Sequence, residues 1–343
     1  MNTANEYDAT VLRESDRRKK LPPRLWVVVP CYNEEEVLPE TSRRLADKMA
    51  FLMDAGRISE DSHVLLVNDG SRDATWSQIE QLHAGSLGNV SVTPGLFCGL
   101  SLAHNAGHQN ALYAGLMQAL DHDCDCTISL DADLQDDINA IDEMLARHEE
   151  GAEVVYGVRS SRATDTAFKR NTAEAFYAFM RWLGVEMVSD SADYRLMGRK
   201  PLLALAQYQE VNLFLRGIVP AIGFPSAKVY YERGERFAGE SKYPLTKMIS
   251  FALEGITSFS IKPIRMVTLA GLLALAVSVI MVIYALASRI SGNVVAGWTS
   301  LMVSVWFVGG LIMVSLGIVG EYVGRTYLET KHRPRYVIGE LLD

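Results

Sequence analysis

The 343-residue chain has little of what marks several common protein classes. Its four cysteines form no Cys-x-x-Cys pair, which argues against a disulfide scaffold or a zinc knuckle and predicts free thiols, as in a reducing compartment. With 11 prolines and 26 glycines, the chain is neither collagen-like nor of low complexity. Basic residues are also scarce: 33 Lys and Arg stand against 41 Asp and Glu, a net charge of -8, so we expect no nucleic-acid partner.

Three sequence motifs are missing as well. No GxGxxG follows the first apolar run and no GxxxxGKS/T occurs, so neither a dinucleotide site nor a P-loop is predicted. Residues 1–20 are polar without an apolar core, so we expect no signal peptide.

Residues 1–22 instead form a charged segment that contains the basic cluster Arg17 to Lys20. We expect a flexible basic arm, either solvated or lying on anionic lipid.

Long hydrophobic runs, in contrast, are present. Residues 266–287 and 290–320 carry no charge, and only Arg289 interrupts them. A bilayer span needs about 20 apolar residues, whereas the alternative, a buried core helix, is seldom so long or so uniformly apolar. We therefore predict two transmembrane helices, at about 266–287 and 297–320. Basic residues flank both runs and predict that both termini are cytosolic in an inner or plasma membrane: Lys262, Arg265, Arg325, Lys331, Arg333 and Arg335.

Between the arm and these runs, short β-branched segments alternate with helical stretches. The predicted strands are Leu25–Val29, Val64–Val67, Val90–Thr93, Thr127–Leu130 and Glu153–Tyr156. The predicted helices are Glu34–Met53, Asp73–His83, Gly107–Leu120 and Ile138–His148. Such alternation predicts an α/β fold with a mostly parallel sheet covered by helices on both faces.

Polar clusters follow three of the strands, where sheets of this kind bind ligands. They are Pro30–Glu34, Asn68–Ser71 and Asp131–Gln135. Asp131 and Asp133 stand two residues apart just past a strand, and Gln135 adds an amide oxygen, a donor set that suits Mg²⁺. An exposed acidic turn is the alternative, but Asp69 at a neighbouring strand end favours a site.

The stretches VVVPCYNEEE, VNDGSRDATW and SLDADLQDD occur in this order. With the two apolar runs, residues 24 to about 338 resemble family 2 polyprenyl-phosphate glycosyltransferases of the bactoprenol glucosyltransferase type, relatives of dolichol-phosphate mannose synthase. The resemblance implies four parts after the arm: a Rossmann-like GT-A catalytic domain over 23–232, juxtamembrane amphipathic helices over 233–264, a transmembrane hairpin over 265–323 and a cytosolic tail over 324–343.

The resemblance also implies roles for individual residues. Those expected to bind the nucleotide are Pro30, Tyr32, Asn33, Glu34, Asp69 and His108. Asp133 and Gln135 would bind Mg²⁺ or Mn²⁺, with Asp131 beside the sugar, and the expected catalytic residues are Asp131, Asp133 and Arg195. Those expected to bind phosphate or the acceptor are Arg159, Arg162, Arg195, Arg216 and Lys242. His104 stands where the family often has Arg, which leaves its role open.

The implied function is that of an inverting hexosyltransferase. It would move a sugar, with UDP-glucose as the leading donor, onto undecaprenyl or another polyprenyl phosphate at the cytosolic membrane face and give a β-linked product. Related enzymes form homo-oligomers, and the sequence leaves open whether this chain does the same. Mannose, an N-acetylhexosamine or an aminoarabinose derivative remain alternative sugars.

Two other functions fit less well. A processive polysaccharide synthase would need more spans and a QxxRW block, which is absent. The intact Asp131-x-Asp133 pair disfavours a non-catalytic membrane subunit. Residues 245–259 carry apolar residues at helical spacing, which predicts an interfacial helix, with packing on the catalytic domain as the alternative.

Overall fold

The computed structural model describes residues 21–88, 90–160, 191–211, 213–232, 234, 260, 262–290 and 297–343. The chain divides into two compact units. The first comprises residues 1–177, 186–243 and 334–343, and the second comprises 178–185 and 244–333. The predictions for Arg162, Lys242 and the interfacial helix at 245–259 lie outside the described residues.

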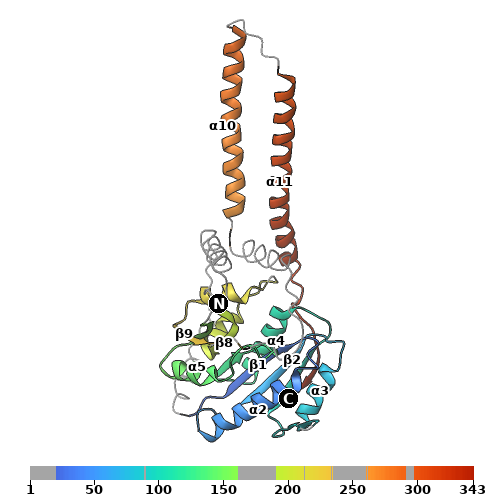
Figure 1. The fold of residues 1–343 in the computed structure, drawn as a ribbon, viewed down its shortest axis with the longest axis vertical. Coiled ribbons are helices and arrows are strands. Elements are labelled where there is room, and N and C mark those ends of the chain that lie inside the picture. The colour runs from blue at the N-terminus through green and yellow to red at the C-terminus, as the bar shows by residue number, and fades with distance from the viewer. Residues whose placement is uncertain are drawn as a thin grey trace, which may run out of the picture. The chain divides into compact units, whose positions relative to one another are not determined.

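The first unit is built on a mixed sheet, which has eight strands in the part of the chain that is described (Figure 1). The strand order is β10-β5-β2-β1-β6-β8-β7-β9. Six strands are mutually parallel: β1 (Leu25–Cys31), β2 (His63–Asn68), β5 (Phe97–Leu102), β6 (Cys126–Ser129), β7 (Val154–Arg159) and β9 (Ser226–Tyr231). The antiparallel strands are β8 (Ser191–Gly198), between β6 and β7, and β10 (Ile338–Leu342), at the edge beside β5. The predicted mostly parallel α/β sheet is confirmed.

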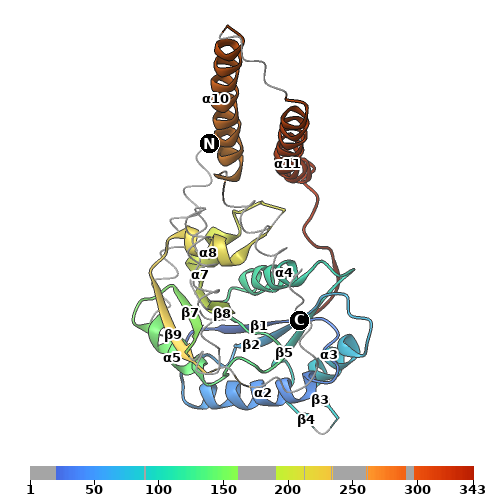
Figure 2. The same cartoon turned by 45° about the horizontal axis from the view of Figure 1, so that its top comes forward.

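Helices cover both faces of this sheet (Figure 2). One face is covered by α2 (Leu38–Asp54), α3 (Thr75–His83) and α5 (Ala140–Glu149). The other is covered by α4 (His108–Asp121) and α7 (Arg199–Leu205), and α8 (Leu215–Ile222) lies against α7. The sequence of β1 is apolar because both faces of the strand are covered. Val27 and Val29 belong to the core under α2, whereas Val28 faces α4. Strands buried on both faces lose the polar alternation of a half-exposed strand.

Helix α4 approaches the sheet closely at Gly115. A Cβ atom there would lie 2.4 Å from Val28 Cγ1 and 2.7 Å from Val67 Cγ2. Val28 and Val67 are fully buried in the two central strands, so they have no room to move aside. The missing side chain therefore sets the depth at which α4, and with it the residues of its first turn, sits on the sheet.

The prediction of a sheet strand at Val90–Thr93 is wrong. Residues Val90–Ser91 (β4) pair instead with Ser86–Leu87 (β3) in a separate two-stranded sheet. The strand beside β2 is β5, whose sequence FCGLSL contains a glycine and two polar or weakly apolar positions that weaken the strand pattern. Its six residues are nevertheless all buried.

The end of the chain returns to the sheet. Helix α11 (Trp298–Thr330) is followed by β10, which pairs antiparallel with β5 over Ile338↔Leu102 to Leu342↔Gly99. The range expected to be a cytosolic tail thus comprises a helix end and a sheet strand, and residues 334–343 belong to the first unit.

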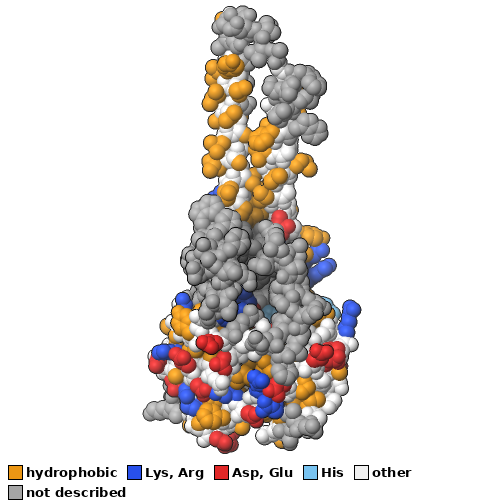
Figure 3. Space-filling view, in the orientation of Figure 1, with side chains coloured by type: hydrophobic (Ala, Val, Ile, Leu, Met, Phe, Trp, Pro, Cys, Tyr) orange, Lys and Arg blue, Asp and Glu red, His pale blue; other side chains and the backbone are white. Residues whose placement is uncertain are grey.

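The second unit contains α10 (Lys262–Ile290) and α11. Both helices are long and apolar enough to cross a membrane, in segments 262–281 and 307–330, judged by length and composition. None of either segment is buried, and large apolar side chains such as Leu272 and Phe307 are exposed. Figure 3 shows hydrophobic side chains along the surface of both helices. A core helix of a water-soluble domain would bury them, so this alternative does not fit the described helices.

Replacing Gly115 with alanine should lower the free energy of unfolding of the first unit by about 1–3 kcal/mol. Alanine favours a helix by roughly 1 kcal/mol over glycine, so overpacking against Val28 and Val67 must outweigh that gain. Chemical denaturation of the detergent-solubilised protein would measure the change. Glu80→Ala on the exposed side of α3 is the control and should stay within about 0.5 kcal/mol. A stabilised Gly115→Ala variant would contradict the proposed contact.

Candidate active site

The three predicted polar segments meet at one edge of the sheet. They follow β1, β2 and β6, and β1 lies between the other two strands and parallel to both, so their carboxyl ends share that edge. The backbone N–H of Asp69 donates to the carbonyl of Cys31 at 2.9 Å, which ties the first two segments together. The expectation that these segments gather at one edge is confirmed.

The loop after β1 is held by the loop after β2. The N–H of Asn33 donates to Ser71 Oγ at 3.0 Å, and Asn33 Oδ1 accepts from the N–H of Arg72 at 2.9 Å. The N–H of Glu34 donates to Thr75 Oγ1 at 2.9 Å. Asn33 has a positive φ of 55°, a conformation that asparagine tolerates better than most residues. Tyr32 in the same loop is 44% exposed.

Asp69 is buried and shapes the neighbouring loop. Its two carboxylate oxygens accept from the N–H groups of Ala106 at 2.6 Å and Gly107 at 3.0 Å. Burial raises the pKa of Asp69, and these two hydrogen bonds oppose the rise. Gly70 beside it is required by the same contact, because a Cβ atom there would lie 2.6 Å from the backbone nitrogen of Asn105. The carboxylate thus fixes the loop that leads into α4.

The segment from Asp131 to Gln135 is held by hydrogen bonds from two other parts of the chain and by one bond of its own. Thr41 Oγ1, on α2, donates to the carbonyl of Ala132 at 2.7 Å. The N–H of Gly234 donates to the carbonyl of Gln135 at 2.9 Å. Within the segment, Asp133 Oδ1 accepts from the N–H of Gln135 at 3.1 Å, and Leu134 adopts a positive φ of 58° while its side chain is buried. The turn therefore holds Asp133 and Gln135 close together.

The side chains of the Asp131–Gln135 turn supply only some of the ligands that a metal ion needs. Among the described residues there is no group of three or more His, Cys, Asp or Glu side chains placed to hold a metal ion. Asp133 and Gln135 nevertheless offer hard oxygen donors, and Mg²⁺ is commonly held by one or two carboxylates together with water and substrate phosphate oxygens. The donor set suits a cation shared with a phosphate-bearing substrate rather than a cage made by the protein alone.

Beside this turn, Asp193 on β8 is surrounded by cationic groups. Arg195 Nη2 donates to its Oδ1 at 2.7 Å, and Arg216 donates to both oxygens, from Nε at 3.2 Å and from Nη2 at 2.9 Å. His108 Nε2 lies 3.4 Å from Asp193 Oδ2 and 3.7 Å from Asp131 Oδ1. The register of β8 against β6 brings this cluster to the edge, because Ser129 pairs with Arg195.

The pKa values in this cluster follow from its charges. Burial favours the neutral form of Asp193, but Arg216, His108 and Arg195 outweigh it and hold the pKa of that carboxyl well below its usual range. Burial likewise lowers the pKa of His108, yet its contacts with Asp193 and Asp131 raise it to about 9, even though 45% of its side chain is exposed. Burial raises the pKa of Asp131 to about 6, and nearby carboxylates add to the rise. His108 is therefore a cation at neutral pH.

The predicted basic residues differ in how they are placed. Arg195 is 3% exposed, and its Nη1 also donates to the carbonyl of Leu215 at 3.2 Å, so it lies beneath the site surface. Arg216 is 32% exposed at the same carboxylate. Arg159, at the end of β7, lies 3.6 Å from the buried Asp136, which also accepts a hydrogen bond from Tyr231. Of the predicted basic residues that the structure describes, Arg216 and Arg159 thus combine a site position with substantial exposure.

Two residues of this region were not predicted. Gln109 donates to Asp193 Oδ2 at 3.3 Å and accepts from the N–H of Leu215 at 3.0 Å, joining α4, β8 and α8. Tyr231 contacts Asp136 directly after the Asp131–Gln135 turn. The only feature of the sequence that could have pointed to Gln109 is its position next to His108 at the start of a predicted helix. Nothing near Tyr231 in the sequence indicates its partner.

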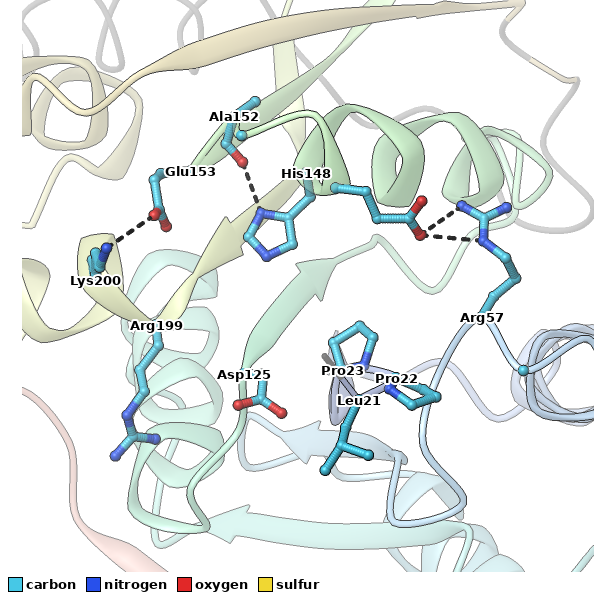
Figure 4. A pocket seen from close by; sticks show the side chains of 13 residues that line it. Leu21, Pro22, Pro23, Arg57, Asp125, His148, Ala152, Glu153, Arg199 and Lys200 are labelled. Atoms are coloured by element: carbon cyan, nitrogen blue, oxygen red, sulfur yellow. Dashed lines mark hydrogen bonds and ion pairs between the residues drawn. The ribbon is translucent and has the colours of Figure 1, made fainter. Parts of the chain in front are cut away.

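A separate cavity of about 590 Å³ lies at the other end of the strands (Figure 4). It is lined by residues such as Pro23, just before β1, and Asp125, just before β6. Its charged groups are paired within the protein: Arg57 donates to Glu149 at 3.1 Å, and Lys200 lies 3.7 Å from Glu153. This cavity is distinct from the candidate site.

Comparison with known proteins decides the family. Residues 26–205, which extend from β1 through α7, match the family described as "Glycosyl transferase family 2". The chain belongs to glycosyl transferase family 2. It is a glycosyltransferase, and its mostly parallel mixed sheet is of the GT-A kind.

Relatives of this glycosyltransferase match it over nearly its full length. It is 51% identical to "Uncharacterized glycosyltransferase YkoT" of Bacillus subtilis over 93% of this chain and 92% of that protein. It is 38% identical to "Prophage bactoprenol glucosyl transferase homolog" of Escherichia coli, over 91% and 97%, and to "Bactoprenol glucosyl transferase" of Shigella phage SfV over the same shares. The solved mannosyl-3-phosphoglycerate synthase of Rubrobacter xylanophilus is similar over 70% of this chain and 74% of its own, at 14% identity and a TM-score of 0.44, which is too low to support an argument.

Because Asp193 and Arg195 form a buried ion pair, Asp193→Asn should strongly lower the free energy of unfolding. Removing one partner leaves a buried, uncompensated charge, which typically costs about 3–5 kcal/mol. The control is Asp123→Asn, because Asp123 pairs with Arg199 at 2.8 Å on the surface and should cost less than about 1 kcal/mol. Denaturant unfolding of both variants measures the difference. Equal and small effects would mean that Asp193 is not the centre of the cluster.

Proposed function

We propose that this glycosyltransferase moves glucose from UDP-glucose onto a polyprenyl phosphate at the cytosolic face of a membrane. The observation that carries the proposal is the match of 91% of the chain to proteins named bactoprenol glucosyl transferase, of which the match covers 97%. This match is much longer than the family match over residues 26–205. Other hexoses remain alternatives, because the contacts that select the sugar are few.

The membrane assignment draws on the sheet as well as on the helices. Strand β10 follows α11 but belongs to the same eight-stranded sheet as β1 and β9. The chain must therefore return to the side on which it left the sheet, which requires an even number of crossings between residues 244 and 333. Two apolar helices meet this requirement, and the flanking Lys and Arg residues favour the cytosolic side for the catalytic domain.

The donor would lie along the edge formed by Tyr32, Asn33, Glu34 and the Asp131–Gln135 turn. An exposed Tyr32 ring offers a face for stacking a base. Pro30 and Asp69 would act beneath, since Pro30 is only partly exposed and both oxygens of Asp69 bind the backbone. Asp133 and Gln135 would hold Mg²⁺ or Mn²⁺ with the diphosphate. When bound, this ion would supply positive charge that offsets the charge developing on the leaving diphosphate.

The acceptor phosphate would lie beside Arg216. Its guanidinium already binds a carboxylate through two nitrogens, a geometry that also suits phosphate, and about a third of it remains exposed. Arg195 would act from below, by keeping Asp193 ionised and oriented. Arg159 is placed for the phosphates on the other side of the turn, and Arg162 and Lys242 are proposed to add charge from outside the described residues.

The chemistry needs little help from a base. A phosphate monoester has a second pKa of about 6 and is largely a dianion at neutral pH. An oxygen of the lipid phosphate would form a bond to the anomeric carbon while the bond from that carbon to the nucleoside diphosphate breaks, which inverts the configuration. UDP leaves with the bonding pair. Asp131, beside the cationic His108, would orient the sugar without accepting a proton.

Asp133→Asn should lower transfer by about 10²-fold or more, because it weakens stabilisation of the leaving group. The assay would follow UDP release and lipid product mass with full-length protein, UDP-glucose and undecaprenyl phosphate. Chelation with EDTA should abolish transfer, and added Mg²⁺ should restore it. Asp137→Asn, an exposed neighbour in the same loop, is the control and should remain within about twofold. Absence of product with any common UDP- or GDP-sugar would refute the proposed function.

The rate should rise through about pH 6 as the lipid phosphate loses its second proton, and then stay level between pH 7 and about 8.5. Above that range it should fall as His108 loses the charge that its pKa of about 9 gives it. A pH–rate profile of the wild type tests this. An additional ascending limb, on which the rate rises with pH and which disappears in Asp133→Asn, would instead identify Asp133 as a general base.

A further inference from the structure

The last residues of the chain contact the catalytic unit along a continuous line. We name residues 334–343 the C-terminal strap. The N–H of Ala103 donates to the carbonyl of Val337 at 2.9 Å, Trp76 Nε1 donates to Glu340 at 3.2 Å, and Asp343 lies 3.3 Å from His122. Through β10 the strap covers β5, which would otherwise be an open sheet edge. The strap is therefore a fixed part of the unit.

The first part of the strap, before β10, contacts helix α4 and the segment between α7 and α8 through the side chain of Arg335. Arg335 Nε donates to the carbonyl of Glu210 at 2.7 Å, and its Nη2 donates to the carbonyl of Tyr208. Its guanidinium carbon also lies 4.5 Å from the ring centroid of Tyr113, on α4. One planar group thus joins the segment between α7 and α8 to α4.

The segment that Arg335 binds leads directly to the acceptor side of the site. It runs from the end of α7 to α8, and Arg216 is the second residue of α8. Its far end is held by Gln109, which accepts from the N–H of Leu215 at 3.0 Å. Gln109 and Tyr113 are one turn apart on α4 and therefore share a face of that helix. The segment is held at one end by Gln109 and at the other by Arg335.

We infer that Arg335 is a positioning residue for sugar transfer, acting through the α7–α8 segment on Arg216 and Asp193. It lies on the strap, far along the chain from the site motifs, and it touches backbone carbonyls rather than a reacting group. Its guanidinium makes two hydrogen bonds and a ring contact at once, which a lysine ammonium does not reproduce. The role assigned to Arg216 rests on the proposed function, whereas the contact between strap and segment does not.

The test compares Arg335→Lys with Arg333→Lys in the full-length protein. Both variants keep the charge, and Arg333 is an exposed neighbour two residues away. Arg335→Lys should lower turnover about tenfold, since small displacements of positioned groups have effects of that order or larger, with the KM for UDP-glucose within about twofold of wild type. Arg333→Lys should match wild type. A fully active Arg335→Lys would mean that only charge matters and would overturn the inference.

Two further measurements separate positioning from general damage. Amide hydrogen exchange should become faster in residues 206–216 of Arg335→Lys, while β1 and β2 stay as protected as in wild type. Arg216→Lys should reduce turnover less in the Arg335→Lys background than in wild type, because both changes act on one contact. Unchanged exchange, or fully additive losses, would overturn the inference. If wild-type protein transfers no sugar to polyprenyl phosphate, the proposed function fails, and the exchange measurement alone still decides whether Arg335 holds the segment.

Discussion

The buried carboxylate of Asp193 is the constraint on which the site depends. It receives hydrogen bonds from Arg195, Arg216 and Gln109, and His108 lies 3.4 Å away. These partners come from β8, α8 and α4, so one ionised group fixes three elements relative to each other. A charge at this depth is stable only while its partners remain in place. The same arrangement places three basic side chains, Arg195, Arg216 and His108, around this one carboxylate, which suits the proposed approach of two phosphates.

Much of the donor side could be predicted from the sequence, because its residues follow strands that are recognisable by themselves. Parallel strands carry their carboxyl ends to one edge, so Tyr32, Asp69 and Asp133 could be grouped from the order of strands and polar segments alone. The hydrogen bonds from Thr41 and Gly234 join the turn to distant parts of the chain. Within the turn, however, Asp133 accepts from the N–H of Gln135 two residues further on, which is a local contact. Local patterns of this kind are visible in a sequence.

The acceptor side could not be assembled in the same way. Strand β8 is antiparallel and inserts between β6 and β7, and its register places Arg195 beside Ser129 across a separation that no local pattern encodes. Burial of Arg195 likewise follows from this pairing, whereas the family resemblance implied an arginine that binds phosphate. The strand β5 was missed for a different reason: FCGLSL owes its burial to β2 and β10 on either side and not to its own hydrophobicity.

The order of the elements along the chain constrains how the apolar helices can cross a membrane, because the chain leaves the sheet before these helices and returns to it after them. Strand β9 ends before the helices begin, and β10 completes the opposite edge of the same sheet after they end. A single crossing would separate β10 from β5 by a bilayer, so the sheet can be complete only when the number of crossings is even. Arg335 lies in the strap three residues before the start of β10. The register of β10 on β5 therefore also limits where the guanidinium of Arg335 can lie. Pairing at the sheet edge thus determines whether Arg335 reaches the segment that carries Arg216.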